Sequence, residues 1–201
     1  MTKLFPVLVA AGALCLGAQA GAVTLFSFET GLEGWADIAT TPVFTLSQST
    51  IGATDGSHSM KLSFSGGFSW VGTGQTSGTV LQQLSSHDKF MFDLTIPDGF
   101  SGNWFNTLLA FNGATGGWRQ GAASITLPLT AGTQTITVDY SALVKPLASD
   151  SWFQMFLGFN GPAGAPRDFY VDNFRTESVP EPATIAVLGV GALALLRRRR
   201  S

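Results

Sequence analysis

The chain has 201 residues, of which 45% are hydrophobic and only 12% are charged, and its formal net charge is -2. Between residues 23 and 178, nine Asp and three Glu stand against three Lys and three Arg, so this body has a net charge of -6. Phosphate binding needs clustered Lys and Arg, so this acidity argues against nucleic acid as a partner. The single cysteine, Cys15, lies before the body, which excludes disulfides and thiolate metal sites within it.

The first 22 residues have the pattern of a secretory signal peptide. Lys3 gives a short basic start, an apolar stretch covers residues 4–17, and small residues at Ala18 and Ala20 match the positions that a signal peptidase reads. Cleavage after Ala20 or after Ala22 fits this pattern equally well. We therefore expect a signal helix over 1–22 that is removed during export.

The body, residues 23–178, is the length of one domain and shows repeated alternation of apolar and polar residues. In the segment 90–96, Phe90, Phe92, Leu94 and Ile96 share one face, which is typical of a half-buried strand. About ten such strands are predicted, with turns of Gly, Ser, Asn and Asp between them: 23–28, 43–46, 60–64, 79–84, 90–96, 105–111, 125–129, 133–140, 152–159 and 168–175. Without helical crossovers, this pattern predicts an all-β antiparallel sandwich, most simply a jelly roll.

The last 23 residues, 179–201, have three parts in a fixed order. Pro180, Glu181 and Pro182 come first, an uncharged apolar run covers 183–196, and a basic cluster follows at Arg197, Arg198, Arg199 and Arg200. As a helix the run spans about 21 Å, which is short for a bilayer core of about 30 Å, although the arginines can snorkel. We expect a short transmembrane helix whose basic end stays cytoplasmic and leaves the body outside.

This tail closely resembles the PEP-CTERM sorting signal of Gram-negative bacteria. The resemblance implies recognition by an exosortase, a membrane cysteine protease that cuts near the motif at 180–182. It also implies transient residence in the inner membrane and export to the cell surface or extracellular matrix. The alternative is an ordinary C-terminal anchor helix, which is usually nearer 20 apolar residues long.

Three segments of the body resemble jelly-roll carbohydrate-binding modules and their galactose-binding-like relatives. Residues 26–35 resemble the opening "F-E-x-G-x-x-G-W" segment, residues 55–62 the "G-x-x-S-L-x-L" strand entry, and residues 169–174 the closing "F-Y-I-D-N" strand. The resemblance implies a structural calcium held by Glu29 and Asp172, with Asp55 in the nearby loop, and hard oxygen ligands suit that ion. The alternative is that these carboxylates are solvated turn acids or a capping pair.

Sugar binding by such a module uses aromatic rings that stack on pyranose rings, with polar side chains fixing the hydroxyls. Trp104 and Trp118 lie in polar, glycine-rich surroundings and are the best candidates, followed by Trp70, whereas Trp35 and Trp152 have the pattern of core residues. Polar side chains that flank these tryptophans are Asn103, Asn106, Arg119 and Gln120.

No catalytic residues are predicted. The run Ser85-Ser86-His87-Asp88 has the residue types of a triad, but neighbours on an extended chain point to opposite faces. The acidic residues show no recognisable pairing for glycoside cleavage. The sequence therefore favours a noncatalytic polysaccharide-binding protein. A structural or adhesive surface protein without a specific glycan is the first alternative, and a polysaccharide hydrolase or lyase is the second.

Overall fold

The computed structural model describes residues 22–177, apart from 40, 75–77, 100–102, 122–124 and 163–166. The predicted signal helix and the predicted C-terminal helix lie outside the described residues. Residues Gly21–Val179 form one compact unit. Within its described part, no helix has the length and apolarity needed to cross a membrane.

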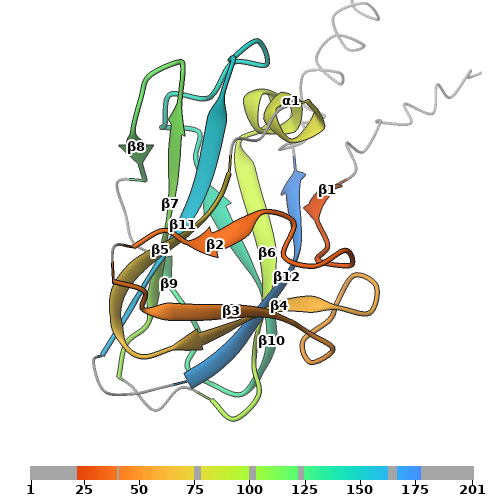
Figure 1. The fold of residues 1–201 in the computed structure, drawn as a ribbon, viewed down its shortest axis with the longest axis vertical. Helices are drawn as coiled ribbons and strands as arrows, with labels where there is room; N and C mark the ends of the chain where they lie inside the picture. Colours follow the sequence, from red (N-terminus) through yellow and green to blue (C-terminus); the bar gives the residue numbers. More distant parts are fainter. Residues whose placement is uncertain are drawn as a thin grey trace, which may run out of the picture. The chain divides into compact units, whose positions relative to one another are not determined.

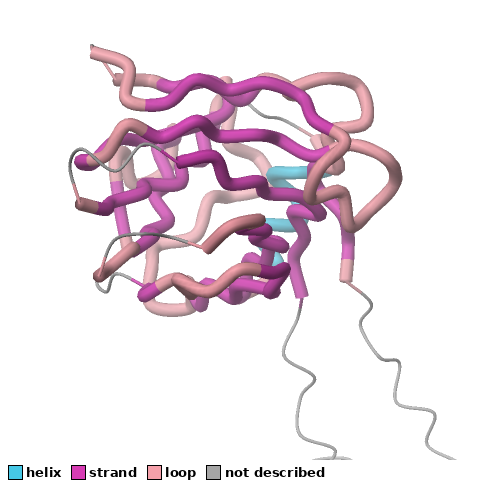
Figure 2. The backbone as a smooth tube through the Cα atoms, turned by 90° about the horizontal axis from the view of Figure 1, so that it is seen from below, coloured by secondary structure: helices cyan, strands magenta, loops and turns pink. Residues whose placement is uncertain are grey.

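The unit is a sandwich of two six-stranded sheets whose strand pairs are all antiparallel, which confirms the predicted all-β jelly-roll fold (Figure 1). The first sheet, sheet A, has the order β10-β6-β12-β4-β3, and β1 also pairs with β12. The second sheet, sheet B, has the order β2-β5-β11-β7-β8, and β9 also pairs with β7. Figure 2 shows the strands of this unit from a perpendicular direction.

The strands divide equally between the two sheets. Sheet A contains β1 (Val23–Phe26), β3 (Phe44–Ser49), β4 (Ser59–Phe64), β6 (Lys89–Ile96), β10 (Gly132–Asp139) and β12 (Arg167–Glu177). Sheet B contains β2 (Trp35–Asp37), β5 (Gly67–Thr73), β7 (Asn106–Gly113), β8 (Arg119–Gln120), β9 (Ile125–Thr126) and β11 (Phe153–Gly161).

The core between the sheets consists largely of phenylalanine rings. On β6, the four residues predicted to share a face, Phe90, Phe92, Leu94 and Ile96, are at most 1% exposed. Phe174 on β12 is fully buried and packs edge-on against five other rings, which come from both sheets and from the loop after β1: Phe26, Phe28, Trp35, Phe90 and Phe92. A core of this size can hold the unit together without a disulfide.

Five details of the predicted strand pattern are wrong. Residues 79–84 are not a strand but part of the helix α1 (Thr79–Ser86), in which Leu81 and Leu84 lie three positions apart and are both buried. This spacing puts both leucines on one helical face toward the core. The predicted strand 125–129 is reduced to β9, and the strands β2, β5 and β8 were not predicted. These elements are short or rich in glycine, so they show little alternation.

Candidate functional site

A row of aromatic side chains lies on the outer face of sheet B. Along β5, Ser69 and Val71 are buried toward the core, so Phe68 and Trp70 point to the other face. Their rings meet edge-on with centroids 5.1 Å apart. Trp70 also crosses the neighbouring strand, because a Cβ added at Gly158 on β11 would lie 2.8 Å from Cζ3 of its ring. The glycine therefore lets the tryptophan lie close to the sheet.

Trp118, in the turn before β8, extends this row. Its ring is 5.3 Å from that of Trp70 at 86°, and 5.1 Å from that of Phe156 at 37°. Phe156 is only 3% exposed, whereas Trp118 is 46% exposed. Trp118 thus covers Phe156 and still presents ring surface to solvent, as stacking on a sugar requires. We call the set Phe68, Trp70, Trp118 and Phe156 the aromatic platform.

Amide side chains border the aromatic platform on the same face. Asn112 on β7 donates to Gln154 on β11, with 3.2 Å between Nδ2 and Oε1. Asn106 lies opposite Asn160 in the β7–β11 pair, and Gln120 lies opposite Ala110 in the β7–β8 pair. Carboxamides of this kind can donate to and accept from sugar hydroxyls.

Trp104 lies just before the first residue of β7. It is 36% exposed and directly precedes Phe105, which is fully buried. The carbonyl of Phe105 accepts a hydrogen bond from the backbone N–H of Leu127 (2.7 Å), so the strand geometry extends this far. Alternation then puts Trp104 on the same face as Asn106. Trp104 makes no ring contact with the aromatic platform among the described residues, and Asn103 beside it is exposed.

Arg119 has a different surrounding from the one expected for a sugar-binding arginine. Its Nε donates to the carbonyl of Val144, and its Nη1 donates to the carbonyl of Gly117 at 2.6 Å. Partial burial lowers the pKa of the guanidinium, and the carboxylate of Asp150 opposes that shift. In this structure the side chain joins the turn that carries Trp118 to the loop before β11. Its role in glycan binding stays a prediction.

The three acidic residues predicted to bind calcium gather around one loop, residues 50–58, which joins β3 to β4. Glu29 Oε1 accepts the backbone N–H groups of Ser57 (2.8 Å) and His58 (2.7 Å), and these bonds lower the pKa of Glu29. Asp55 lies in the loop, and its Oδ2 accepts from the Thr24 hydroxyl at 3.4 Å. Glu29 thus holds one side of the loop.

Asp172 holds the loop from the sheet below. It is fully buried, and its Oδ2 accepts the backbone N–H groups of Thr54 (2.6 Å) and Asp55 (2.8 Å). Its other oxygen, Oδ1, is buried without a hydrogen-bond partner. Among the described residues, no three side chains of His, Cys, Asp or Glu converge as a metal site requires. A bound cation would therefore need carbonyl oxygens of the loop in addition to Asp172.

Asp93 on β6 lies opposite Asp172 and is also nearly buried. Burial raises its pKa, but hydrogen bonds from Thr135, Arg175 and Thr54 outweigh that effect and keep the pKa below its ordinary value. The Arg175 guanidinium lies 3.1 Å from Asp93 Oδ1. The loop covers these two facing carboxylates, so they are not presented to a polymer substrate.

The Ser-His-Asp run does not assemble a triad. Ser86 Oγ is 3.1 Å from His87 Nδ1, but it also donates to the carbonyl of Gln82 at 2.9 Å. Asp88 pairs with Lys145 on the loop after β10. The other histidine, His58, lies 3.5 Å from the carboxylate of Glu29. The described histidines therefore bind neighbouring loops and turns.

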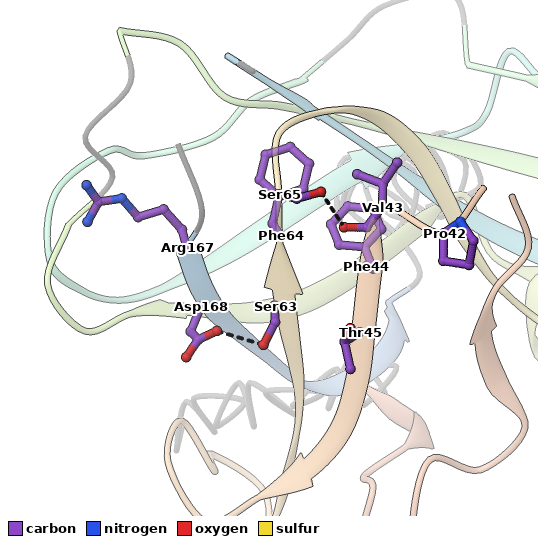
Figure 3. A pocket seen from close by; sticks show the side chains of 9 residues that line it. All are labelled: Pro42, Val43, Phe44, Thr45, Ser63, Phe64, Ser65, Arg167 and Asp168. Carbon is purple, nitrogen blue, oxygen red and sulfur yellow. Dashed lines mark hydrogen bonds between the residues drawn. The ribbon is translucent and has the colours of Figure 1, made fainter. Parts of the chain in front are cut away.

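Sheet A carries a hollow of about 550 Å³ over β3, β4 and the start of β12 (Figure 3). Thr45, Ser63, Asp168 and other polar side chains line it, and Asp168 accepts from Ser63 and pairs with Lys61. The two rings in its lining are only 2% and 3% exposed. The hollow thus lacks an open aromatic face, and the sheet B surface is the better candidate for stacking on sugars.

Comparison with known proteins identifies the sorting signal. A model of the PEP-CTERM protein-sorting motif matches residues 178–200, as expected from the tail. No curated protein sequence matches the chain significantly. The matched residues carry the motif, the apolar run and the arginines, so this chain bears a PEP-CTERM sorting signal.

The solved structures that resemble the chain are mainly carbohydrate-binding modules. One is a module of the β-sandwich superfamily, with a TM-score of 0.57 and 18% identity over 77% of this chain and 62% of that longer chain. A family 11 module of Clostridium thermocellum in complex with a mixed-linked β-1,3-1,4 tetrasaccharide has a TM-score of 0.55, with 18% identity over 81% and 98% of the two chains. A module of Caldicellulosiruptor saccharolyticus in complex with mannohexaose has a TM-score of 0.55, with 14% identity over 80% and 98%. The body therefore has the fold of these modules.

Proposed function

We propose that this is an exported surface or matrix protein whose sandwich binds polysaccharide without cleaving it. The observation that carries the proposal is the aromatic platform, which gathers rings from three segments far apart in the chain on one sheet face. A surface of tryptophan and phenylalanine bordered by amides provides both stacking and hydrogen bonding for a sugar chain. The PEP-CTERM signal supports delivery of this surface to the outside of the cell.

Affinity electrophoresis tests the binding. The unit Gly21–Val179, which contains the whole core of the described chain, is run through gels that hold a panel of extracellular polysaccharides. We expect retardation by at least one polymer, loss of that retardation in Trp118→Ala, and a smaller loss in Trp104→Ala. The matched control is Ile51→Ala, because Ile51 is 52% exposed and lies in the loop over sheet A.

The alternatives give different results in the same assay. Absence of retardation by any polymer favours a structural or adhesive protein without a specific glycan. Shortening of the polymer during incubation favours a hydrolase or lyase. Retardation that survives Trp118→Ala moves the binding surface away from the aromatic platform.

We propose further that an exosortase cuts the chain near Pro180-Glu181-Pro182 and removes the basic end. The order of the parts of the sorting signal supports this step. Mass spectrometry of the mature protein from its host is expected to show loss of residues 183–201. An intact chain that still ends in the four arginines contradicts the processing step.

A structural calcium beside Asp172 is a separate proposal. The unpartnered Oδ1 of Asp172 supports it, since a buried carboxylate oxygen needs a partner and suits a hard cation. Asp55 on this loop and Glu29, which accepts hydrogen bonds from it, add negative charge. A cation that binds only the folded state stabilises it by about 2.7 kcal/mol at a hundred times Kd. Melting curves that coincide in calcium and in chelator contradict this proposal.

A further inference from the structure

The edges of the two sheets differ in length. In sheet B, the outer strands are short: β2 has three residues, and β8 and β9 have two each. Short edge strands are one way in which proteins prevent another chain from adding to a sheet. In sheet A, the outer strands are β3, with six residues, and β10, with eight. Within the described chain, long edges therefore belong to sheet A.

The edge of β3 is already occupied by side chains. Asp37 Oδ2 accepts the backbone N–H groups of Val43 (2.8 Å) and Phe44 (2.7 Å) at the start of the strand. Near its end, Gln48 Nε2 donates to the carbonyl of Phe28 at 2.6 Å. Residues of the segments around β1 and β2 thus engage β3 at both of its ends.

The edge of β10 has no such cover in the described chain. Its register with β6 is unbroken from Gly132 to Asp139, without a bulge. The strand contains no proline and no lysine, and Asp139 at its end is its only charged residue. Thr133 and Thr135 tie the strand to β6 by hydrogen bonds of 2.7 and 2.6 Å to side chains of Thr95 and Asp93. A long, unbulged, nearly uncharged edge is the kind that accepts another strand.

The positions of the free backbone groups follow from the register. The N–H of Tyr140 donates to the carbonyl of Asp88 (2.8 Å), one step beyond the β10–β6 ladder. Hydrogen-bonded pairs alternate along an antiparallel ladder, so the even-numbered residues of β10 bond to β6. The N–H and C=O groups of Thr133, Thr135 and Thr137 therefore point to the open edge.

We propose that β10 pairs antiparallel with β10 of a second copy of this chain. The backbone groups that face the open edge belong to odd-numbered residues in both copies, so odd-numbered residues pair with odd-numbered ones. Directly paired residues share a face of the sheet, so threonine meets threonine along the outer face. The two Asp139 carboxylates lie at opposite ends of the joint, which avoids repulsion between them. The contact is two-fold and self-complementary, so it closes at the dimer.

The dimer gives the protein a further function if the proposed function holds. Two aromatic platforms on one particle can bind two polysaccharide chains and cross-link them, or bind one chain with higher avidity. This consequence rests on glycan binding by sheet B. The pairing of β10 does not, so the two can fail separately.

Sedimentation velocity of the unit Gly21–Val179 over a range of concentrations, without glycan, tests the pairing. Salt of about 0.15 M limits the screening length to about 8 Å and so weakens repulsion between two acidic bodies. We expect a monomer–dimer equilibrium. We also expect the amides of Thr133, Thr135 and Thr137 to exchange with deuterium more slowly as the dimer forms. A monomer at all concentrations, with these amides equally fast throughout, overturns the proposal.

Thr137→Pro gives a matched test of the edge. It removes an N–H that faces the open side and leaves the ladder to β6 intact, which is where an edge strand tolerates proline. Each dimer loses two donors, one from each copy. We therefore expect the dissociation constant of the dimer to rise tenfold or more, roughly the change that 1.4 kcal/mol produces. Thr137→Val keeps the N–H and should dimerise like the wild type. A folded Thr137→Pro protein that still dimerises with wild-type strength places the contact elsewhere.

Discussion

Truncation of Phe174 should be among the most destabilising single changes in the sandwich. The ring is fully buried, and its five edge-on partners lie at centroid distances from 5.0 to 6.3 Å. Phe→Ala in a core costs roughly 3–5 kcal/mol from lost transfer free energy and the cavity left behind. For a domain of this size, 1 kcal/mol corresponds to about 2–4 °C, so we expect the melting temperature of Phe174→Ala to fall by roughly 6–20 °C.

Urea unfolding followed by tryptophan fluorescence measures the cost. Trp35 is a direct reporter, because its ring is 5.0 Å from that of Phe174. The matched control is Phe68→Ala, which removes the same atoms from a side chain that is 44% exposed and should change the free energy of unfolding by at most about 0.5 kcal/mol. Equal effects of the two substitutions, or a loss below about 1 kcal/mol for Phe174→Ala, would refute the placement of Phe174 at the centre of the core.

Three further predictions follow from single contacts. Gly158→Ala adds a Cβ 2.8 Å from the ring of Trp70, so we expect a cost of about 1–3 kcal/mol and a changed tryptophan emission, and an unchanged spectrum contradicts that contact. Burial raises the pKa of Tyr140, so above about pH 10 this tyrosine ionises in the unfolded chain before it does so in the folded protein. The free energy of unfolding of the wild type is therefore unaffected by Tyr140 ionisation below about pH 10 and falls as the pH rises further. Tyr140→Phe should lose about 1 kcal/mol at neutral pH from a missing hydrogen bond but show a weaker alkaline decline, as urea unfolding at pH 7 to 11 can measure. A hydrogen bond from Lys61 lowers the pKa of the largely exposed Asp168, so Lys61→Met should raise that pKa in an NMR titration while changing stability by less than about 1 kcal/mol.

The sequence predicts the fold where burial produces a regular period. The segment 90–96 alternates over its full length because one side faces core rings and the other faces solvent, and the structure has β6 there. The strand prediction for residues 79–84 fails because the segment is short and Leu81 and Leu84 lie less than one helical turn apart, so a helical period is hard to recognise there. Tertiary contacts decide the outcome, since Leu81 and Leu84 both bury in the core.

The candidate site could be predicted only in part. Trp70 and Trp118 are visible as exposed aromatics in glycine-rich segments, but their contact depends on the registers of β5, β11 and β7, which sequence spacing does not reveal. Phe68 was missed, although its spacing of two from Trp70 indicates a shared strand face. Arg119 was predicted to flank a sugar site, but its guanidinium binds the carbonyl of Val144. That carbonyl is 25 positions away in the chain, so local sequence gives no sign of the contact.

The place of β12 in sheet A sets a constraint on the timing of folding. β12 is the last strand of the described residues, yet it lies between β4 and β6, and β1 also pairs with it. Until residues 167–177 have been synthesised, the two halves of sheet A have no strand to join them, and the first strand of the body has no partner. Sheet B depends in the same way on β11, which lies between β5 and β7, so before residues 153–177 are synthesised the chain can form only separate strand pairs, and isolated pairs are marginally stable in water. From this topology we expect the sandwich to be completed only late in synthesis, and an incompletely folded polypeptide is the form that can be threaded through a narrow channel.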